Sequence, residues 1–379
     1  MHRKHLVAAV AAVALAGTAL GGPAGADAPE AKATPKTLAK DLLSPLSLAV
    51  TNNGTVFYSQ NFAGVLNMKA PGRKAQVVYA AEVPGTEVGA VSVDRTSVQF
   101  ATTFVPEAPE GEEPEGEPHT ALMQLGADGE ATEIADLWGY EEEVNPDGDV
   151  EYGFRDLPEG CEVPPFLQAY PGIVESHPYA TTQHRGKTYI ADAAMNAILK
   201  VGKSGKLSTV AVLPAQPLVI TEAVIEALKA QELELPECTL GETIWLEPVP
   251  TDVEVGPKGK LYVTTLPGGP EDPSLGPRAA VYRVDAKTGK SKKVVGGLMS
   301  ATGLAVKPNG NVYVAELFGG RIARIKKGAT KVGTLLQAGL PGDVELRENG
   351  DIYATINVLS GLSGEEGDTP AGQVIRIKR

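Results

Sequence analysis

The sequence predicts an all-β fold, and internal repetition is the observation that predicts it. Six segments share one pattern: an alternating apolar strand, a tight turn that usually contains Gly, and a second apolar strand that usually carries Tyr. The three clearest copies are 250–263, 302–314 and 341–354. Asn309-Gly310 and Asn349-Gly350 mark two of the turns, where Gly accepts the positive φ of a hairpin. Each copy therefore predicts a β-hairpin.

The remaining copies and their third strands fix the number of repeats. Three further copies cover 44–59, 87–102 and 177–191, the second with Asp94-Arg95-Thr96 at its turn. A third apolar strand follows each hairpin, at 64–66, 121–123, 197–199, 280–284, 321–325 and 373–377. Without insertions the repeat spans about 40 residues, the length of one four-stranded propeller blade. The sequence thus predicts a six-bladed β-propeller.

The two ends of the repeat array predict how the ring closes. The last copy ends directly after its third strand and lacks an outer strand. Segment 37–43 resembles the outer strand at 331–336, so we expect it to complete the last blade and to hide two strand edges. Two separate β domains are the alternative. Regular spacing and matched ends favour a single propeller over residues 27–379.

The first 26 residues predict a secretion signal. Positive residues at 2–5 precede an apolar run over 6–20, and Ala24-Gly25-Ala26 supplies a small-residue cleavage pattern. An uncleaved membrane anchor is the alternative, but the run is short for a span of roughly 20 residues. We expect a secreted, extracellular chain that begins near Asp27 and has no membrane span after signal removal.

The net charge of −13 limits the class of partner. It argues against nucleic acid and against an anionic membrane surface. We expect a monomer whose partner is an extracellular ligand or protein. Two acidic stretches, 107–117 and 141–151, are expected to be solvated loops. Within the second, Asp147-Gly148-Asp149 resembles part of a Ca²⁺ loop but lacks the register of an EF-hand.

Two insertions, 135–175 and 214–248, break the repeat and carry the only cysteines. Residues 221–230 predict a short amphipathic helix with Thr221 as its N-cap. One cysteine lies in each insertion, so export predicts a Cys161–Cys238 disulfide. A metal-binding or nucleophilic pair is the alternative, but no His or third Cys is suitably spaced. The insertions are expected to form a cross-linked cap over one face of the ring, beside the third blade.

Three stretches, Ser176-His177-Pro178-Tyr179, 190–201 and Val249-Pro250-Thr251, resemble the ScyD/ScyE family. These are exported bacterial proteins similar to NHL and gluconolactonase-like propellers. The resemblance covers most of the mature chain. It departs at His177, where the family usually has Asn, and at 265–269, where it usually has an acidic residue and an aromatic-rich loop. The resemblance implies the fold but no reaction, so the site needs its own argument.

Aligned inner strands predict a candidate metal site. The equivalent positions near the starts of these strands are Ser47, Gly89, Tyr179, Asp252, Gly303 and Asp343. Two carboxylates that converge on a narrow channel repel each other unless a cation or hydrogen-bond donors lie between them. Asp252 and Asp343 are therefore candidate ligands for Ca²⁺ or another divalent cation. The alternative is that each Asp accepts backbone hydrogen bonds at a strand start.

Other polar residues near the same mouth are candidates for binding or proton transfer. His177 and Tyr179 flank a Pro at the mouth of the channel, where an imidazole can bind a ligand or move a proton. A packed or loop His is the alternative. Asp192 and Glu316 end equivalent second strands and are expected to tie neighbouring loops, with a role in a pocket wall as the second possibility.

Two functions remain open after these observations. The sequence lacks a Gly-rich phosphate loop, a Gly-x-Ser-x-Gly elbow and a His-Glu-x-x-His helix. The favoured interpretation is a secreted propeller that binds a small molecule, glycan or protein on its capped face, with Tyr179, Asp192 and His177 as candidate contacts. The alternative is a cation-dependent hydrolase or lactonase in which His177 or Glu316 moves a proton.

Overall fold

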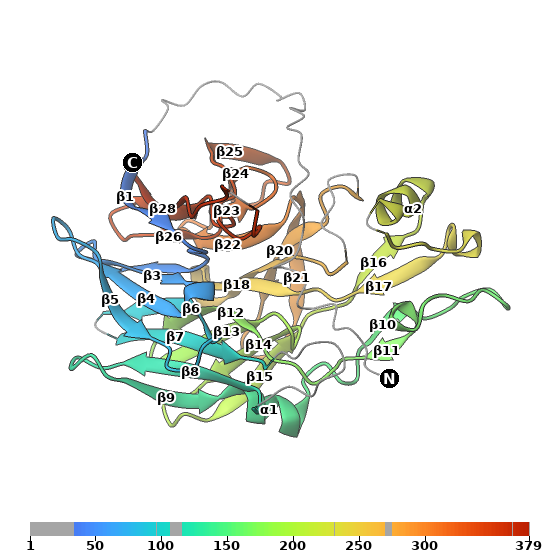
Figure 1. The fold of residues 1–379 in the computed structure, drawn as a ribbon, viewed down its shortest axis with the longest axis horizontal. Helices are drawn as coiled ribbons and strands as arrows, with labels where there is room; N and C mark the ends of the chain where they lie inside the picture. The colour runs from blue at the N-terminus through green and yellow to red at the C-terminus, as the bar shows by residue number, and fades with distance from the viewer. Residues whose placement is uncertain are drawn as a thin grey trace.

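The computed structural model describes residues 34–95, 97–106, 116–230, 232–269, 275–365 and 367–378. The predicted signal peptide lies outside these ranges. Within them, six four-stranded antiparallel sheets surround a central axis, and a seventh sheet extends from the ring (Figure 1). The predicted six-bladed β-propeller is therefore confirmed.

Blades 1 to 5 each run from an inner to an outer strand in chain order. Blade 1 contains β2 (Leu48–Val50), β3 (Val56–Gln60), β4 (Val65–Lys69) and β5 (Gln76–Ala80). Blade 2 contains β6 (Glu87–Asp94), β7 (Ser97–Phe104), β8 (His119–Leu125) and β9 (Ala131–Asp136). Blade 3 contains β12 (Pro178–His184), β13 (Lys187–Asp192), β14 (Ala197–Val201) and β15 (Leu207–Val212). Blade 4 contains β18 (Pro250–Val255), β19 (Leu261–Thr265), β20 (Ala279–Val284) and β21 (Ser291–Leu298). Blade 5 contains β22 (Ala301–Val306), β23 (Val312–Glu316), β24 (Arg321–Ile325) and β25 (Val332–Gln337).

Blade 6 joins the two ends of the described chain. Its strands are β26 (Val344–Leu346), β27 (Ile352–Ile356), β28 (Gly372–Ile377) and β1 (Lys36–Leu42). β1 pairs antiparallel with β28, from Lys36 opposite Arg376 to Leu42 opposite Gly372. The predicted closure by the N-terminal strand is thus present, and it covers the edge of β28 that would otherwise be unpaired.

The hairpin turns and the core follow the repeat pattern. Gly310 and Gly350 take φ values of 88° and 91°, which a Cβ would strain. Neighbouring blades bury apolar side chains against each other. Tyr58 of blade 1 and Tyr353 of blade 6, for example, share one cluster and are each 1% exposed. Because each blade packs on both neighbours, the inner strands are held rigidly around the channel.

The two insertions fold together into a cap. They supply a four-stranded sheet in the order β11-β10-β17-β16 and two helices. Its elements are β10 (Glu151–Phe154), β11 (Tyr170–Pro171), β16 (Gln216–Val219), β17 (Thr243–Leu246), α1 (Leu137–Val144) and α2 (Glu222–Lys229). Short 3₁₀ turns η2 (Asn61–Ala63), η3 (Pro165–Leu167), η4 (Glu237–Thr239) and η5 (Pro257–Gly259) complete the described secondary structure. No described helix has the length and apolar character required to cross a membrane.

The cap confirms two predictions and corrects two others. The Cys161–Cys238 disulfide is present, and Thr221 Oγ1 caps α2 by accepting the Val224 N–H at 3.3 Å. The prediction that 141–151 is a solvated loop is wrong, because its first part belongs to α1 and because Glu141 and Asp147 are buried. The cap was also expected to cover one face of the ring. In Figure 1 its sheet and α2 instead extend sideways beyond the inner strands.

Candidate functional site

Asp252 and Asp343 connect neighbouring blades. Asp252 accepts the N–H groups of Val253 and of Leu304, which lies on the inner strand of blade 5. Asp343 accepts the N–H groups of Val344 at 2.7 Å and of Leu48, on the inner strand of blade 1, at 2.8 Å. Each carboxylate therefore closes a seam between two inner strands. The sequence offered such backbone hydrogen bonds as the alternative to metal binding by these two residues.

Sequence reasoning missed two further carboxylates on the same strands. Glu254 and Glu345 each lie two residues after an Asp, so strand alternation places them on the same side of β18 and β26. The signal was available, because both repeats contain the tripeptide Asp-Val-Glu. Both glutamates are half-buried, and Glu254 accepts the Thr182 hydroxyl of blade 3 at 3.5 Å.

The four carboxylates of the inner strands perturb one another. Burial and the carboxylate of Asp343 raise the pKa of Asp252, and burial also raises the pKa of Asp343. Burial together with neighbouring carboxylates raises the pKa of Glu254 and of Glu345. Among the described residues, no three His, Cys, Asp or Glu side chains gather as a metal-binding group. The channel is therefore acidic, but its carboxylates do not form a compact set of three ligands.

Asp192 and Glu316 tie loops, as the sequence predicted. Asp192 is fully buried and accepts the His177 N–H and the Ser176 hydroxyl, both at 2.9 Å. Glu316 accepts the Met299 N–H at 2.8 Å and the Arg321 Nε–H at 2.7 Å. Both oxygens of each carboxylate are engaged, so these residues hold the loops that lead into the inner strands of their blades.

His177 contacts an acidic residue that the sequence analysis did not single out. Its Nε2 lies 3.3 Å from Oε2 of Glu87, at the start of β6 in blade 2. The Tyr179 ring lies edge-on to the imidazole, with 6.3 Å between ring centroids. Burial alone would lower the pKa of His177, but the Glu87 carboxylate and two further carboxylates raise it. The structure thus joins His177 and Tyr179 and adds Glu87 to them.

A buried polar network connects the cap to blade 3. Asn196 Nδ2 donates to Asp147 Oδ2 at 2.9 Å, and Asn196 Oδ1 accepts the Val249 N–H at 3.0 Å. Tyr152 also donates to Asp147 Oδ2, at 2.9 Å. Nearby, Tyr170 donates to Glu247 at 3.1 Å. We call this region the cap root, because one asparagine of blade 3 binds the first insertion and the residue that directly follows the second.

Burial raises the pKa values of the acids at the cap root. It raises the pKa of Glu141 to about 8, with contributions from the Asp192 and Asp147 carboxylates. It raises the pKa of Glu247 to about 7 and that of Asp147 to about 6, although the bonds from Asn196 and Tyr152 oppose the shift at Asp147. These acids were not predicted from the sequence, because they become neighbours only when the two insertions fold together.

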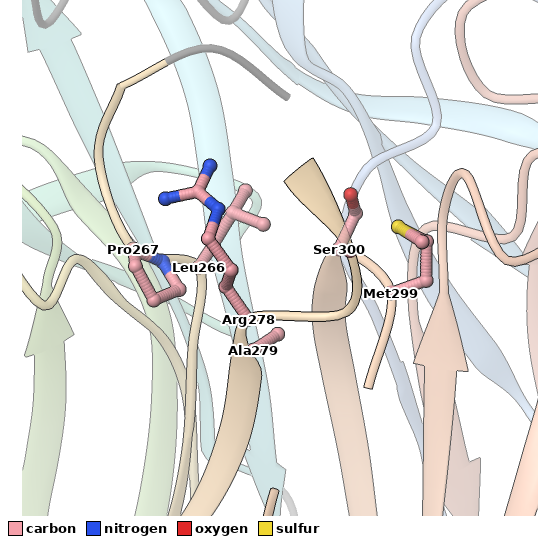
Figure 2. A pocket seen from close by; sticks show the side chains of 7 residues that line it. Leu266, Pro267, Arg278, Ala279, Met299 and Ser300 are labelled. Atoms are coloured by element: carbon pink, nitrogen blue, oxygen red, sulfur yellow. The ribbon is translucent and has the colours of Figure 1, made fainter. Parts of the chain in front are cut away.

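Two depressions lie on the ring itself. Figure 2 shows the first, between blades 4 and 5, with a volume of about 20 Å³, which is room for about one water molecule. It is lined by Leu266, Pro267, Gly276, Arg278, Ala279, Met299 and Ser300. The second is an open depression of about 440 Å³ beside the first hairpin turns of blades 3 and 4, lined in part by His184, Arg185 and Lys258. Neither contains the predicted site residues.

The cap sheet has one face packed on a core and one face directed outward. Cross-strand neighbours Phe154, Ile244 and Leu218 belong to the buried apolar cluster beneath α2. The next cross-strand set, Gly153, Trp245 and Pro217, lies on the opposite side. The Arg155 guanidinium stacks over the Trp245 ring at 4.2 Å from its centroid. We call this side, with exposed Val219 on the edge strand, the outer face of the cap.

Exposed apolar side chains concentrate on the cap. Eight large apolar residues of the described chain are exposed, and five of them lie in the two insertions. These five are Val144, Phe166, Val174, Val219 and Leu240. Scattered apolar residues are ordinary on a protein surface, whereas their accumulation on one module is typical of a contact region.

Comparisons with known proteins agree on the fold. No protein-family model matches the chain, and no curated protein matches it. Three similar solved structures are a Thermus thermophilus oxidoreductase described as a glucose dehydrogenase, the Escherichia coli soluble aldose sugar dehydrogenase and a Xanthomonas campestris gluconolactonase. Their TM-scores are 0.55, 0.52 and 0.50, at 13%, 12% and 10% identity. In the same order, the matched regions cover 91%, 91% and 90% of this chain and 99%, 99% and 89% of the three similar chains.

These likenesses show that the chain has the β-propeller fold. At such low identity they establish the fold alone. The finer resemblance to the ScyD/ScyE family stays a prediction from the sequence.

Proposed function

We propose that this chain is an exported β-propeller that uses the outer face of its cap to bind a protein partner in the extracellular space. The observations that carry the proposal are that five of the eight exposed large apolar side chains of the described residues lie in the two insertions, and that one of them, Val219, lies on the outer face with Trp245. Such a concentration is unfavourable in water unless another surface covers it.

The composition of the outer face supports a protein as the partner. Trp245 and Arg155 are of the residue types that contribute most to protein interfaces, where aromatic and guanidinium groups bury large areas. Pro217 and Val219 add exposed apolar surface on β16, the edge strand of the cap sheet. Because the Trp245 ring is already stacked by Arg155, the face is less suited to stacking a sugar ring than to contact with apolar side chains.

The rigidity of the cap also supports a binding role. The disulfide joins the two insertions, and the cap has its own apolar cluster, which includes Phe154, Val224 and Ile244. A preorganised surface loses little conformational entropy when a partner binds. The propeller would then act as a rigid base that holds this surface away from the ring.

The proposal is tested by the loss of a specific partner. The wild-type protein and a Trp245→Ala/Val219→Asp variant are immobilised and incubated with the extracellular fraction of the producing cells. Bound proteins are quantified by mass spectrometry. We expect at least one protein to be retained by the wild type and to fall at least ten-fold with the variant.

The matched control is Val77→Asp, on the outer edge strand of blade 1, where Val77 is exposed to a similar extent. It should retain the same protein as the wild type. An identical set of bound proteins for all three variants would contradict the proposal. Sedimentation of the wild type distinguishes a second copy of the chain from a different partner.

The acidic channel favours a second candidate, a cation-dependent lactonase. Four carboxylates lie on or directly before the two inner strands β18 and β26, and one of the similar structures is a gluconolactonase. Asp252 and Asp343 each bind the N–H groups of two strands, whereas Glu345 accepts the Leu346 N–H through one oxygen, so its other oxygen is the candidate cation ligand. A bound cation would polarise a lactone carbonyl or activate a water molecule.

This candidate is tested with glucono-δ-lactone. If it is correct, hydrolysis needs Ca²⁺ or another divalent cation, stops with chelator and falls at least 100-fold in Glu345→Gln. The exposed substitution Glu348→Gln is the control and should leave the rate unchanged. Lack of any protein-dependent hydrolysis with every divalent cation added would reject the lactonase and leave the binding proposal standing.

A further inference from the structure

Buried oxygen atoms without hydrogen-bond partners accumulate in one short segment. Six buried side-chain nitrogen or oxygen atoms of the described residues lack a partner. Three of them are oxygens within seven residues: Oε2 of Glu141, Oδ1 of Asn145 and Oδ1 of Asp147. Leaving a buried polar atom unpaired is costly, so three in one place indicate a missing binding partner.

The local backbone brings these three residues together. α1 ends at Val144, and Asn145 follows in a left-handed conformation with φ of 38°, its N–H bound to the Glu141 carbonyl at 2.8 Å. Asp147 lies two residues further on, in the turn before β10. The second half of α1 and the turn that follows it therefore carry the three oxygens without hydrogen-bond partners.

All three residues also contact the same neighbouring segment, 172–175. Glu141 accepts the Glu175 N–H at 3.4 Å through its other oxygen, and Asn145 Nδ2 donates to the Gly172 carbonyl at 3.2 Å. Asp147 Oδ1 packs so closely against Gly172 that a Cβ at this position would clash with it. The three side chains are thus collected around one short stretch of backbone at the cap root.

The region buries two acidic side chains close to each other. Glu141 is 0% exposed and Asp147 1% exposed, and the two carboxylates repel each other as well as Asp192. The oxygens of Asp192 are already bound to backbone N–H groups and to Ser176. Two carboxylates buried this close together are costly unless they are protonated or a positive ion neutralises them.

We propose that Glu141, Asn145 and Asp147 bind one calcium ion at the cap root. The donor set consists only of oxygens, which suits a hard cation, and calcium accepts an amide oxygen beside carboxylates. Waters or backbone carbonyls would complete the six to eight ligands that calcium takes. Asn196 and Tyr152 hold the other oxygen of Asp147 and so fix the direction of its free oxygen.

This site is separate from the acidic channel and from the outer face of the cap. Its role would be to fix the cap against blade 3, since Asp147 is also the residue through which Asn196 holds the first insertion. The proposal does not depend on the nature of the partner of the cap.

Luminescence of bound Tb³⁺ tests the proposal directly. Tb³⁺ replaces Ca²⁺ at oxygen sites. The hydroxyl of Tyr152 donates a hydrogen bond to Asp147, so the Tyr152 ring lies close enough to sensitise the emission of Tb³⁺ bound there. The purified exported protein should bind one sensitised Tb³⁺ that excess Ca²⁺ displaces. Asp147→Asn and Glu141→Gln should each weaken binding at least ten-fold.

Two controls separate this site from other acidic regions. Asp149→Asn removes the charge of an exposed carboxylate in the same turn, and Glu254→Gln removes the charge of one carboxylate in the channel. Asp149→Asn should bind Tb³⁺ and Ca²⁺ as the wild type does, and Glu254→Gln should keep the Tyr152-sensitised Tb³⁺ emission of the cap root. Melting curves in chelator verify folding: Asp147→Asn should melt close to the metal-free wild type, but its melting temperature should no longer rise with Ca²⁺.

Three outcomes would overturn the proposal. They are no saturable Tb³⁺ or Ca²⁺ binding by the wild type, equal binding by wild type and Asp147→Asn, and loss of binding in Glu254→Gln but not in Glu141→Gln. The last result would place the ion in the channel instead.

Discussion

Asn196 donates to Asp147 at 2.9 Å and thereby joins blade 3 to the first insertion, while its carbonyl oxygen accepts the Val249 N–H after the second insertion. Asn196→Ala would leave a buried carboxylate and a backbone N–H without these partners and would strain a residue at φ 53°. We expect a loss of about 3–5 kcal/mol in the free energy of unfolding, measured by urea denaturation.

Asn196→Gly separates the two causes of that loss. Gly adopts the positive φ without strain but cannot form the side-chain bonds. It should recover about 1 kcal/mol relative to Ala and remain well below the wild type. Wild-type stability in both variants would show that the cap root does not depend on Asn196.

Removal of the disulfide is expected to loosen the cap selectively. The two cysteines are 77 residues apart, for which the chain-entropy model gives about 4–5 kcal/mol of stabilisation. In a Cys161→Ser/Cys238→Ser variant, amide hydrogen exchange should accelerate in β10, β16 and β17. Exchange in β22 to β24 of blade 5 should stay unchanged. Uniform acceleration through all blades would contradict the separate stability of the cap.

The two acids of each Asp-Val-Glu tripeptide should respond differently to mutation. Asp252→Ala leaves the Val253 and Leu304 N–H groups without their acceptor, so we expect a loss of about 1–3 kcal/mol. Glu254→Gln removes a negative charge from the channel, and the amide oxygen of Gln can still accept the Val255 N–H. Its stability should equal or exceed that of the wild type. Thermal unfolding of the two variants at pH 8 measures the difference.

The His177–Glu87 pair predicts a pH dependence. Burial lowers the pKa of His177, but the Glu87 carboxylate outweighs this effect, so the folded-state pKa lies above the ordinary 6.5. A raised His pKa stabilises the fold fully below pH 6.5, and this contribution is lost as the pH rises through the folded-state pKa. Because the His177 side chain is 35% exposed, we expect an effect below about 1 kcal/mol.

Histidine NMR titration checks this assignment. In Glu87→Gln the pKa of His177 should fall, and the difference in stability between pH 6 and pH 8.5 should shrink. Glu133→Gln, which removes the carboxylate partner of exposed His119, is the matched control and should leave His177 unchanged. An unaltered His177 titration in Glu87→Gln would contradict the pairing.

The fold was predictable because its determinants are local and repeated. Asn309-Gly310 and Asn349-Gly350 specify hairpins, and the likeness of 37–43 to 331–336 predicted the pairing of β1 with β28. α1 was missed because its three consecutive glutamates suggested solvent. The helix forms because Asp136 caps it at the Gly139 N–H and because Leu137 is buried.

The candidate site was less predictable because it depends on contacts between distant segments. Asp192 and Glu316 could be assigned as loop ties from their repeat positions. For Asp252 and Asp343 the sequence left two alternatives, a bound cation or backbone hydrogen bonds to blades 5 and 1. It could not decide between them, because the spacing of the inner strands is set by the closed ring. Nothing in the sequence predicted the hydrogen bond between Asp147 and Asn196, because Asp147 lies in an irregular insertion that cannot be aligned with the repeats.

The most direct measurement of the proposed cap function is site-specific photo-cross-linking at position 219. A photoreactive phenylalanine analogue replaces Val219 in the cap or, as the control, Val77 in blade 1, both of which are exposed edge-strand residues. After irradiation in the extracellular fraction, the account predicts one discrete protein adduct at 219 and none at 77. Equal labelling at both positions, or no adduct at 219, would contradict it.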